Sequence, residues 1–303
     1  MAFDLAGFSE AAADAVATAG RSVVRVDGRN RDSASGIVWS AEGVIVTANH
    51  VLERNDEITV GVNDEGTTVN AEIVGRDPES DLALLRLVEP EHVGVALAPA
   101  NWRQEGNPRI GAFAWAVARP GRSLQSTLGV VSHMLVAKEK GADGSSEALI
   151  QTDVLMYPGF SGEALVDATG MVLGLNSSAL RRGASAALGY ATVARVVTTL
   201  LEHGRMPRGF LGVGLQPVRL GRDLAEVAEQ ESGLMVMSVE NDGPASRGGV
   251  TQGDVLLAVD GTQIRNLDDL TRLLRGQSAG KRVALRLARG GAVHEVGVAA
   301  GAR

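Results

Sequence analysis

The sequence predicts a mainly β protein of two domains, and three observations lead to this prediction. Over the first two thirds of the chain, short apolar runs alternate with Gly, Asn and Asp, which is typical of the strands and turns of an all-β barrel or sandwich. One amphipathic helix ends that region, and strand-like runs with one further helix follow it. A chain of 303 residues is long enough for two domains, because single cores rarely grow beyond about 250 to 300 residues.

The first domain is predicted to cover residues 21–204, after an N-terminal segment, residues 1–20, that is partly helical. The helical spacing of small apolar residues extends over about residues 8–19. The strand-like runs of the domain include SVVRVDG, GIVWSAEGVIVTA, EITVGVNDEG, AEIVGRD, LALLRLV and GMVLGLNS. Its last element is a helix in ATVARVVTTLLEHG, where valines and leucines recur at steps of three and four and Gly204 marks the end.

The second domain is predicted to cover residues 208–303, after the short linker HGRMPRG. Its strand-like runs are FLGVGLQPV, GLMVMSVE, GDVLLAVDG and RVALRLARGG. The segment NLDDLTRLLRG reads as a helix with Asn266 as its N-cap. One face of this helix carries the leucines Leu267, Leu270, Leu273 and Leu274.

Charge and composition exclude several classes of function. The net charge is -7 and the Lys and Arg residues are scattered, so we expect neither nucleic acid nor a membrane surface as partner. The absence of cysteine excludes disulfides, thiolate metal sites and a cysteine nucleophile, and the sequence predicts no metal or cofactor. The chain has no basic start followed by an apolar run, and no stretch of about 18 apolar residues. We therefore expect a cytoplasmic protein, or a periplasmic or secreted one if the chain is a trimmed mature form.

The stretch LMYPGFSGEALVD presents Ser161 as a candidate nucleophile, although a serine between glycines is usually a turn residue. A serine needs a base to take its proton, and the base needs a third group to orient it. His50 ends the strand-like run VIVTANHV, and Asp81 directly precedes the run LALLRL, so its side chain can turn inward toward an imidazole. The other histidines are expected to be exposed: His92, His133, His203 and His294.

Three stretches resemble the active-site motifs of the HtrA/Deg branch of the trypsin-like serine proteases: TANHV, DLALLRL and PGFSGEALVDATGMVLGLN. The family patterns are close to T-x-x-H-V, D-L-A-x-L and G-N-S-G-G-x-L-x-x-x-x-G-x-V-I-G-I-N, and STLGVVSHM resembles the T-x-G-x-V-S strand of the family. The resemblance implies a chymotrypsin-like double β-barrel in which His50, Asp81 and Ser161 are catalytic. It also implies an oxyanion hole formed by the backbone N–H groups of Gly159 and Ser161.

The stretch GPASRGGVTQGDVLLAVDGTQI resembles the core of a PDZ domain, which implies a partly open β-barrel with flanking helices. By this resemblance, a peptide adds as a β-strand beside the helix that starts at Asn266. The loop that holds the terminal carboxylate of the peptide is formed by Phe210, Leu211, Gly212 and Val213. A β-rich domain that has lost its ligand groove is left open as an alternative.

The resemblance also implies the position of the primary specificity pocket. The residue six before the nucleophile lies at the base of the pocket in this superfamily, and here it is Leu155, which argues against cleavage after Arg or Lys. The other expected lining residues are Met156 and Tyr157, with Leu175, Asn176 and Ser177 opposite. Such a pocket favours small to medium apolar side chains, to which a methionine can adapt.

The nucleophile loop departs from the family pattern, because G-N-S-G-G has become G-F-S-G-E. Phe160 removes the polar side chain that ties this loop down in many relatives, but it removes no backbone donor. Glu163 is strained by roughly 1 to 2 kcal/mol if the glycine of the family has a positive φ there. Its carboxylate could also hold His50 protonated. On both grounds we expect Glu163→Gly to speed turnover.

Two readings of function follow from these motifs. The first is a serine endopeptidase that hydrolyses unfolded or damaged proteins by a Ser-His-Asp acyl-enzyme mechanism, with the PDZ domain binding peptide C-termini or exposed apolar segments. The alternative is a catalytically inactive, peptide-binding or chaperone-like scaffold. Family members are commonly trimers that assemble through N-terminal aromatic residues, so a homotrimer through Phe3 and Phe8 is possible. Packing of a surface helix onto the barrel explains these two residues equally well.

Overall fold

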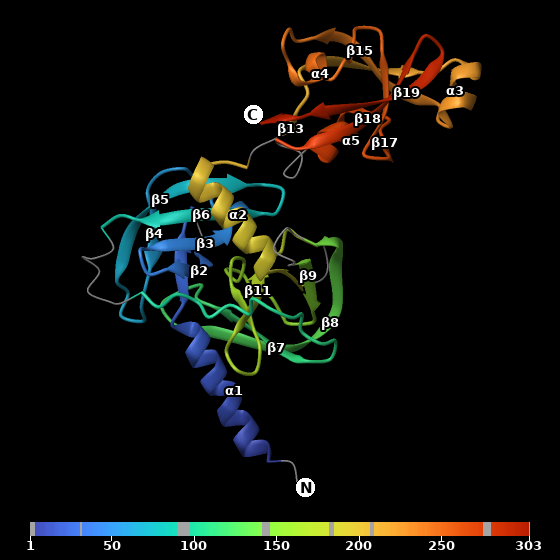
Figure 1. Ribbon diagram of the computed structural model, residues 1–303. Helices are drawn as coiled ribbons and strands as arrows, with labels where there is room; N and C mark the ends of the chain where they lie inside the picture. The colour runs from blue at the N-terminus through green and yellow to red at the C-terminus, as the bar shows by residue number, and fades with distance from the viewer. Residues whose placement is uncertain are drawn as a thin grey trace. The chain divides into compact units, whose positions relative to one another are not determined.

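The computed structural model describes residues 4–30, 32–89, 97–140, 146–181, 185–206, 209–274 and 280–302. The chain divides into two compact units, Met1–Arg205 and Met206–Arg303. The first unit contains two closed β-barrels and the second contains an antiparallel sheet with short helices (Figure 1). The predicted mainly β architecture, a double β-barrel followed by a separate β-rich domain with helices, is thus confirmed.

The first barrel has the strand order β1-β2-β3-β6-β5-β4, with antiparallel neighbours throughout. Its strands are β1 (Val23–Asp27), β2 (Ala34–Ser40), β3 (Val44–Ala48), β4 (Ile58–Gly61), β5 (Thr68–Asp77) and β6 (Leu82–Leu87). The strand β3 is buried along its whole length and is rich in the β-branched residues that favour strands. It leads directly into the short 3-10 turn η1 (Asn49–Val51), which carries His50.

The second barrel has the order β10-β11-β12-β9-β8-β7. Its strands are β7 (Phe113–Ala118), β8 (Gln125–Lys140), β9 (Ser146–Thr152), β10 (Ala164–Val166), β11 (Val172–Asn176) and β12 (Ser185–Gly189). The core of this barrel includes Ile150, Leu165 and Leu173, and Phe160 from the loop between β9 and β10 packs with them. That loop therefore rests on the core of the second barrel.

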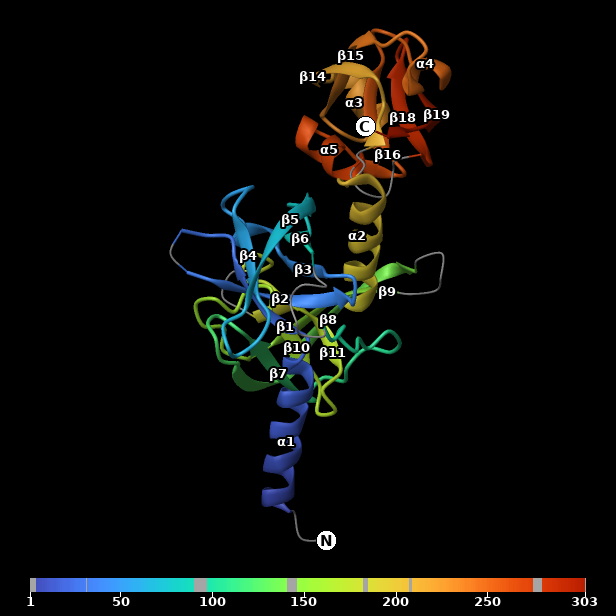
Figure 2. The same ribbon diagram turned by 90° about the vertical axis from the view of Figure 1, so that its left-hand side faces the viewer.

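Helices α1 and α2 belong to the first unit. Helix α1 (Leu5–Gly20) begins after Asp4, whose side chain accepts a hydrogen bond from Gly7 N at 3.0 Å, and it packs against β7 and β10. Helix α2 (Tyr190–His203) ends at Gly204, which has the left-handed conformation expected of a helix-terminating glycine. Helix α2 contacts β5 of the first barrel and β9 and β11 of the second, so it braces the two barrels (Figures 1 and 2).

The second unit is built on a sheet of order β14-β15-β16-β18-β19, with β17 beside β16 and a small pair formed by β13 and β20. The strands are β13 (Gly209–Phe210), β14 (Val213–Arg219), β15 (Ser232–Val239), β16 (Val255–Val259), β17 (Thr262–Gln263), β18 (Arg282–Arg289), β19 (Ala292–Ala299) and β20 (Gly301–Ala302). Helix α5 (Leu267–Leu274) is capped as predicted, because Asn266 Oδ1 accepts a hydrogen bond from Asp269 N at 2.8 Å. Two short helices, α3 (Arg222–Ala228) and α4 (Pro244–Arg247), were not predicted.

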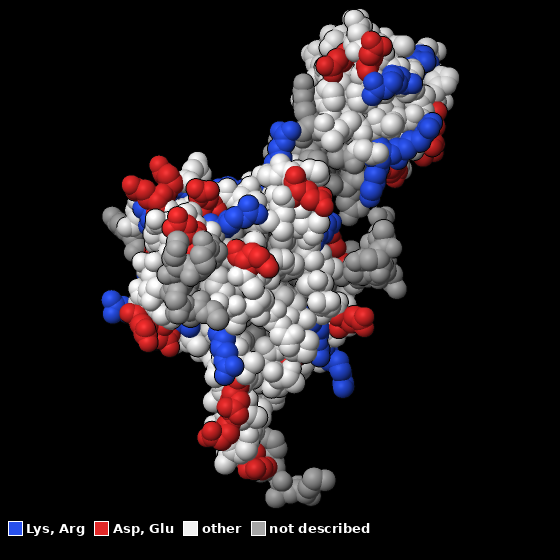
Figure 3. All heavy atoms as spheres, turned by 60° about the vertical axis from the view of Figure 1, so that its left-hand side comes forward, with Lys and Arg blue, Asp and Glu red and all other residues white. Residues whose placement is uncertain are grey.

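The surface carries its charges in small, mixed groups. On the face shown in Figure 3, the Lys and Arg side chains of the described residues are interspersed with Asp and Glu rather than aligned in a stripe. Three of the four histidines predicted to be exposed are exposed, namely His133, His203 and His294, whereas His92 and also Phe3 lie outside the described residues. Within the described ranges, no helix has both the length and the apolar character needed to cross a membrane.

Candidate active site

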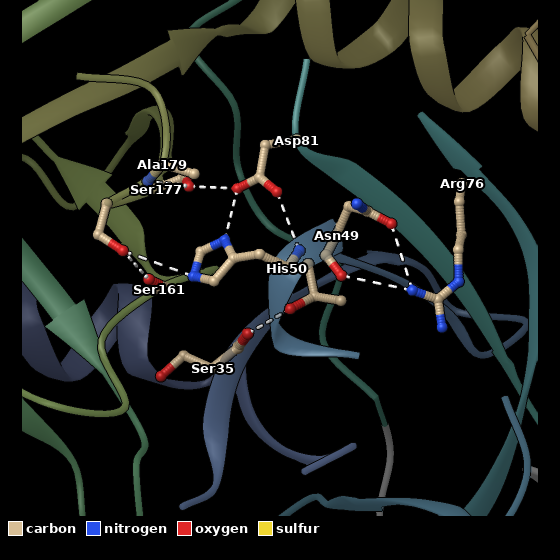
Figure 4. A network of polar contacts seen from close by, with 10 residues as sticks. Ser35, Asn49, His50, Arg76, Asp81, Ser161, Ser177 and Ala179 are labelled. Atoms are coloured by element: carbon tan, nitrogen blue, oxygen red, sulfur yellow. Dashed lines mark hydrogen bonds and ion pairs between the residues drawn. The ribbon is translucent and has the colours of Figure 1, made fainter. Parts of the chain in front are cut away.

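The pairing of β3 with β6 brings His50 and Asp81 together. These strands are antiparallel with Ala48 opposite Leu82, so the residues after the end of β3 lie beside those before the start of β6. Asp81 O accepts a hydrogen bond from Asn49 N at 2.8 Å, and its Oδ1 accepts one from His50 N at 2.9 Å. His50 Nδ1 lies 2.7 Å from Asp81 Oδ2 (Figure 4). With Nδ1–H donating to the carboxylate, Nε2 of the neutral imidazole is left as an acceptor.

Arg76 holds the segment that follows His50. From β5, its guanidinium donates hydrogen bonds to Leu52 O at 2.8 Å and to Arg54 O at 3.0 Å. It also donates to Asn49 Oδ1 at 3.3 Å (Figure 4). The turn that carries His50 is therefore held by Arg76 of β5 and by Asp81, which directly precedes β6.

Asp81 has an unusual backbone conformation, with a φ of 56°, which aspartate tolerates better than most residues. Its side chain is buried and accepts hydrogen bonds from both His50 and the hydroxyl of Ser177. Burial raises the pKa of Asp81, but the hydrogen bonds from His50 and Ser177 and the charge of His50 outweigh it and lower this pKa below its ordinary value. Asp81 is consequently ionised at neutral pH and can stabilise a positive charge on His50.

The nucleophile loop is tied to the first barrel through Ser35 of β2. Ser35 N donates to Ser161 O at 3.1 Å, and Ser35 Oγ donates to Gly159 O at 3.0 Å. Gly162 has a φ of 88°, and a Cβ atom there would approach Ser35 O to 2.1 Å, so glycine is required. Phe160 is fully buried. The loop is thus held by Ser35 and Phe160 rather than by the polar side chain that the family has beside its nucleophile.

The predicted oxyanion hole consists of two backbone N–H groups of the nucleophile loop. Within the described residues, the N–H groups of Gly159 and Ser161 donate no hydrogen bond, whereas Phe160 N donates to Tyr157 O and Gly162 N donates to Asn176 O. Preorganised, unpaired N–H groups next to a nucleophile are what an oxyanion hole requires.

Ser178 lies between Ser161 and His50. Its Oγ is 3.0 Å from Ser161 Oγ and 3.4 Å from His50 Nε2, and among the described residues no direct hydrogen bond joins Ser161 to His50. Figure 4 shows the resulting line of polar contacts, which runs from Ser161 through His50 to Asp81. Sequence reasoning did not single out Ser178, and its one available signal was the serine pair that follows Asn176 in LNSSAL.

The residues predicted to line the specificity pocket fall into two groups. Leu155 and Tyr157 are exposed, and Met156 packs partly buried against the core of the second barrel. The group at the end of β11 is buried and comprises Leu175, Asn176 and Ser177. The polar members of this second group contact other residues of the site, since Ser177 binds Asp81 and Asn176 binds Glu163.

Glu163 differs from the expectation in two respects. It is not among the described non-glycine residues with positive φ, so it carries no left-handed strain. Its side chain is fully buried, and Oε1 accepts a hydrogen bond from Asn176 Nδ2 at 2.9 Å. Burial raises the pKa of Glu163 well above its ordinary value, against the opposing effect of the Asn176 bond. The raised pKa favours the protonated, uncharged form of this carboxyl group. The strain ground for expecting faster turnover in Glu163→Gly is therefore wrong, and burial of the carboxyl group argues against the second ground, a negative charge that holds His50 protonated.

The buried carboxyl makes stability depend on pH. Unfolded Glu163 ionises above about pH 4.3 while the folded form stays protonated, so the unfolding free energy falls by up to about 1.4 kcal/mol per pH unit as pH rises toward the folded pKa. Glu163→Gln removes this dependence, so its unfolding free energy relative to the wild type should increase from about pH 5 to about pH 7. Urea unfolding followed by tryptophan fluorescence reports on the first unit alone, because Trp39, Trp102 and Trp115 all lie there. Parallel pH curves for the two proteins would mean that Glu163 is ionised in the fold.

Comparison with known proteins agrees with this fold. The trypsin-like peptidase domain family matches residues 34–175, and the PDZ domain family matches residues 209–299. Proteins described as probable periplasmic serine endoprotease DegP-like, from Brucella suis and Pseudomonas fulva, are 34% and 35% identical over 87% and 90% of this chain. The chain spans 51% and 57% of the lengths of these two relatives.

Solved structures of HtrA-type and related serine proteases resemble this protein over nearly the whole chain. The HtrA-type protease AlgW with tripeptide is 30% identical, with a TM-score of 0.63 over 96% of this chain and 97% of that one. The serine endoprotease from Yersinia pestis is 26% identical, with a TM-score of 0.66 over 96% of this chain and 97% of that one. The two barrels and the grouping of His50, Asp81 and Ser161 define the class of trypsin-like serine proteases. Within that class, the chain belongs to the HtrA family, whose members join such a protease domain to a PDZ domain.

Proposed function

We propose that this protein is a serine endopeptidase that hydrolyses unfolded or damaged polypeptides through an acyl-enzyme intermediate. The observation that carries the proposal is the line of contacts from Ser161 through Ser178 to His50 Nε2, continued by the 2.7 Å contact of His50 Nδ1 with Asp81. A hydroxyl, an imidazole acceptor and an ionised carboxylate in this order are the groups that nucleophilic acyl transfer needs.

In the proposed mechanism, Ser161 Oγ attacks the scissile carbonyl carbon while its proton passes to His50 Nε2. The Ser178 hydroxyl either relays this proton or moves aside when substrate binds, because catalytic hydrogen bonds are often loose before substrate arrives. The N–H groups of Gly159 and Ser161 stabilise the oxyanion, and Asp81 stabilises the imidazolium. His50 then protonates the leaving amine, and water attacks the acyl-enzyme with His50 again as base.

Labelling with a fluorophosphonate tests the proposal, because covalent capture needs an activated serine and a formed oxyanion hole but no particular substrate. We expect stoichiometric labelling of the full chain at Ser161, with apolar C-terminal peptides added in parallel samples. A folded protein that stays unlabelled under both conditions would favour the inactive scaffold. The position of Ser178 between Ser161 and His50 is the observation that favours this second candidate, the inactive scaffold.

For the second unit, we propose that β14 receives the C-terminal strand of a peptide. β14 is an edge strand of the sheet, and α5 packs beside it. Within the described residues, the N–H groups of Leu211 and Gly212 donate no hydrogen bond, and Gly212 has a φ of 75°. Free N–H groups at the start of an edge strand support the binding of a terminal carboxylate by the loop formed by Phe210, Leu211, Gly212 and Val213.

We propose that the predicted residues around Leu155 and at the end of β11 form the primary specificity pocket. Exposed Leu155 and Tyr157 and the partly buried Met156 leave apolar side chains beside the nucleophile loop, which supports a preference for apolar substrate side chains. Cleavage-site mapping of an unfolded substrate tests it, and cleavage mainly after Arg or Lys would contradict it.

We propose domain boundaries at residues 21–204 for the protease domain and 208–303 for the PDZ domain. The two units have separate hydrophobic cores, so a chain that ends at Met206 is expected to fold alone. It should unfold cooperatively in urea and keep fluorophosphonate reactivity. Insolubility or a broad, noncooperative transition of the shortened chain, with a cooperative one in the full chain, would contradict the boundary.

A homotrimer is proposed from the family resemblance of the sequence, and the location is proposed from the relatives. A homotrimer through the N-terminal segment is testable by light scattering of the purified chain, although the Phe8 ring packs 5.4 Å from the Phe113 ring of the same chain, as expected for ordinary helix packing. Relatives described as periplasmic support a periplasmic location rather than the cytoplasmic one expected from the sequence. Cell fractionation with an antibody against the chain tests this proposal.

A further inference from the structure

We propose that Glu163 is a positioning residue, which acts as the buried hydrogen-bond partner of Asn176 and thereby fixes the nucleophile loop relative to the segment that contacts His50 and Asp81. This inference rests on the proposed function, since it concerns how the side chains of the same site are held in position relative to one another. It assigns a role to a residue at which this chain departs from the pattern of its family.

The contacts of Asn176 carry the argument. Asn176 Nδ2 donates to Glu163 Oε1 at 2.9 Å, and Asn176 Oδ1 accepts from Ser185 Oγ of β12 at 3.4 Å. The backbone reinforces the side-chain contact, because Gly162 N donates to Asn176 O at 2.9 Å and Asn176 N donates to Glu163 O at 3.0 Å. Both Glu163 and Asn176 have no exposed surface. A buried amide in this position needs both partners, since an unsatisfied one is destabilising.

The two residues after Asn176 connect this contact with the chemistry. Ser177 Oγ donates to Asp81 Oδ2, and Ser178 Oγ lies between Ser161 and His50. Glu163 itself follows Ser161 by two positions, separated from it by the tightly packed Gly162. The Glu163–Asn176 contact therefore joins the two segments that supply the nucleophile and the surroundings of the base. A shift of about 1 Å between such segments can cost about a hundredfold in rate.

The neutral form of Glu163 is the form that fits this role. Its Oε2 has no hydrogen-bond partner, and no charged side chain in the described part of the chain pairs with either of its oxygens. The ionisable groups of the site, His50 and Asp81, are bonded to each other instead. An ionised Glu163 would be a buried charge with a single hydrogen bond, which favours local opening of the loop.

The test compares three forms of the full chain by the rate constant of fluorophosphonate labelling, from neutral to alkaline pH. Glu163→Gln keeps the acceptor and cannot ionise, so we expect it to label within about twofold of the wild type at neutral pH and to keep that rate at alkaline pH. The wild type should lose about tenfold or more relative to Glu163→Gln as the pH rises through the raised pKa of Glu163. Glu163→Leu has no acceptor and should label about tenfold to a hundredfold more slowly at every pH. Glu72→Leu, an exposed change on β5, is the matched control and should label like the wild type.

Two results would overturn the inference. One is a folded Glu163→Leu that labels within about twofold of the wild type. The other is an alkaline loss that is the same in the wild type and Glu163→Gln, and this comparison decides the matter if Glu163→Leu does not fold.

A second readout separates this inference from the proposed function. The proton resonance of His50 Nδ1–H, bonded to Asp81, reports the geometry without turnover. If the folded wild type does not label, the proposed function fails, and the resonance then decides the positioning role. Loss of the resonance in Glu163→Leu with retention in Glu163→Gln supports that role, and retention in both contradicts it. In the latter case Glu163 only fills space.

Discussion

Ser161→Ala is expected to abolish fluorophosphonate labelling and to reduce hydrolysis of an unfolded protein by on the order of a millionfold. Among the described residues, the Oγ atom of Ser161 has a single hydrogen-bond contact, to Ser178, whereas the loop is held by backbone contacts to Ser35 and by the buried Phe160. Removing one hydroxyl should therefore change the unfolding free energy by less than about 1.5 kcal/mol. Active-site labelling followed by mass spectrometry, with urea unfolding of the same samples, measures both effects.

The matched control for this prediction is Ser123→Ala, which removes an exposed serine between β7 and β8 and should leave labelling unchanged. Ser178 is the only other hydroxyl that contacts both Ser161 and His50 among the described residues. If Ser161→Ala still labelled and the label were found on Ser178, the assignment of the nucleophile would be wrong. Loss of labelling together with loss of the urea transition would instead show that Ser161 is needed for folding.

Asp81→Asn is expected to lower turnover by about ten-thousandfold while the fold is retained. Three donors converge on the carboxylate, namely the N–H and Nδ1–H groups of His50 and the hydroxyl of Ser177. An asparagine offers one oxygen and an NH₂ group, so His50 Nδ1 must accept a hydrogen bond and Nε2 then carries the proton. In that tautomer His50 cannot take the proton of Ser161. Asparagine tolerates the left-handed backbone of this position, so the turn should persist.

Asp77→Asn is the control for this substitution, because Asp77 is also buried and hydrogen-bonded but contacts Ser80 and Glu79 instead of the site. It should retain nearly full turnover in a peptide hydrolysis assay. Combining Asp81→Asn with His50→Ala should be no worse than His50→Ala alone, since the members of such a group act as a unit. A multiplicative loss in the double variant would mean that Asp81 acts independently of His50.

Local signals in the sequence were sufficient for much of the fold, and together with the family resemblance they singled out His50, Asp81 and Ser161 as candidate residues of the site. The glycine that ends α2 and the asparagine that caps α5 are local rules of helix geometry, and both are observed at Gly204 and Asn266. His50 and Asp81 each flank a strongly apolar strand, so their positions follow from the ends of β3 and β6. The short helices α3 and α4 were missed because they are too short to show helical periodicity.

By itself, therefore, the sequence indicated the main strands and the longer helices, and which side chains could act as nucleophile, base and carboxylate. The tertiary structure decided the burial, the pKa and the contacts of the residues around these side chains. Burial raises the pKa of Glu163, while Asn176, distant in sequence, donates a hydrogen bond to the buried carboxyl group and opposes that rise. Ser178 stands between Ser161 and His50 because the end of β11 packs beside the loop before β10. Backbone conformation and pKa at these positions depend on burial and on contacts between distant segments, which no local pattern of residues encodes.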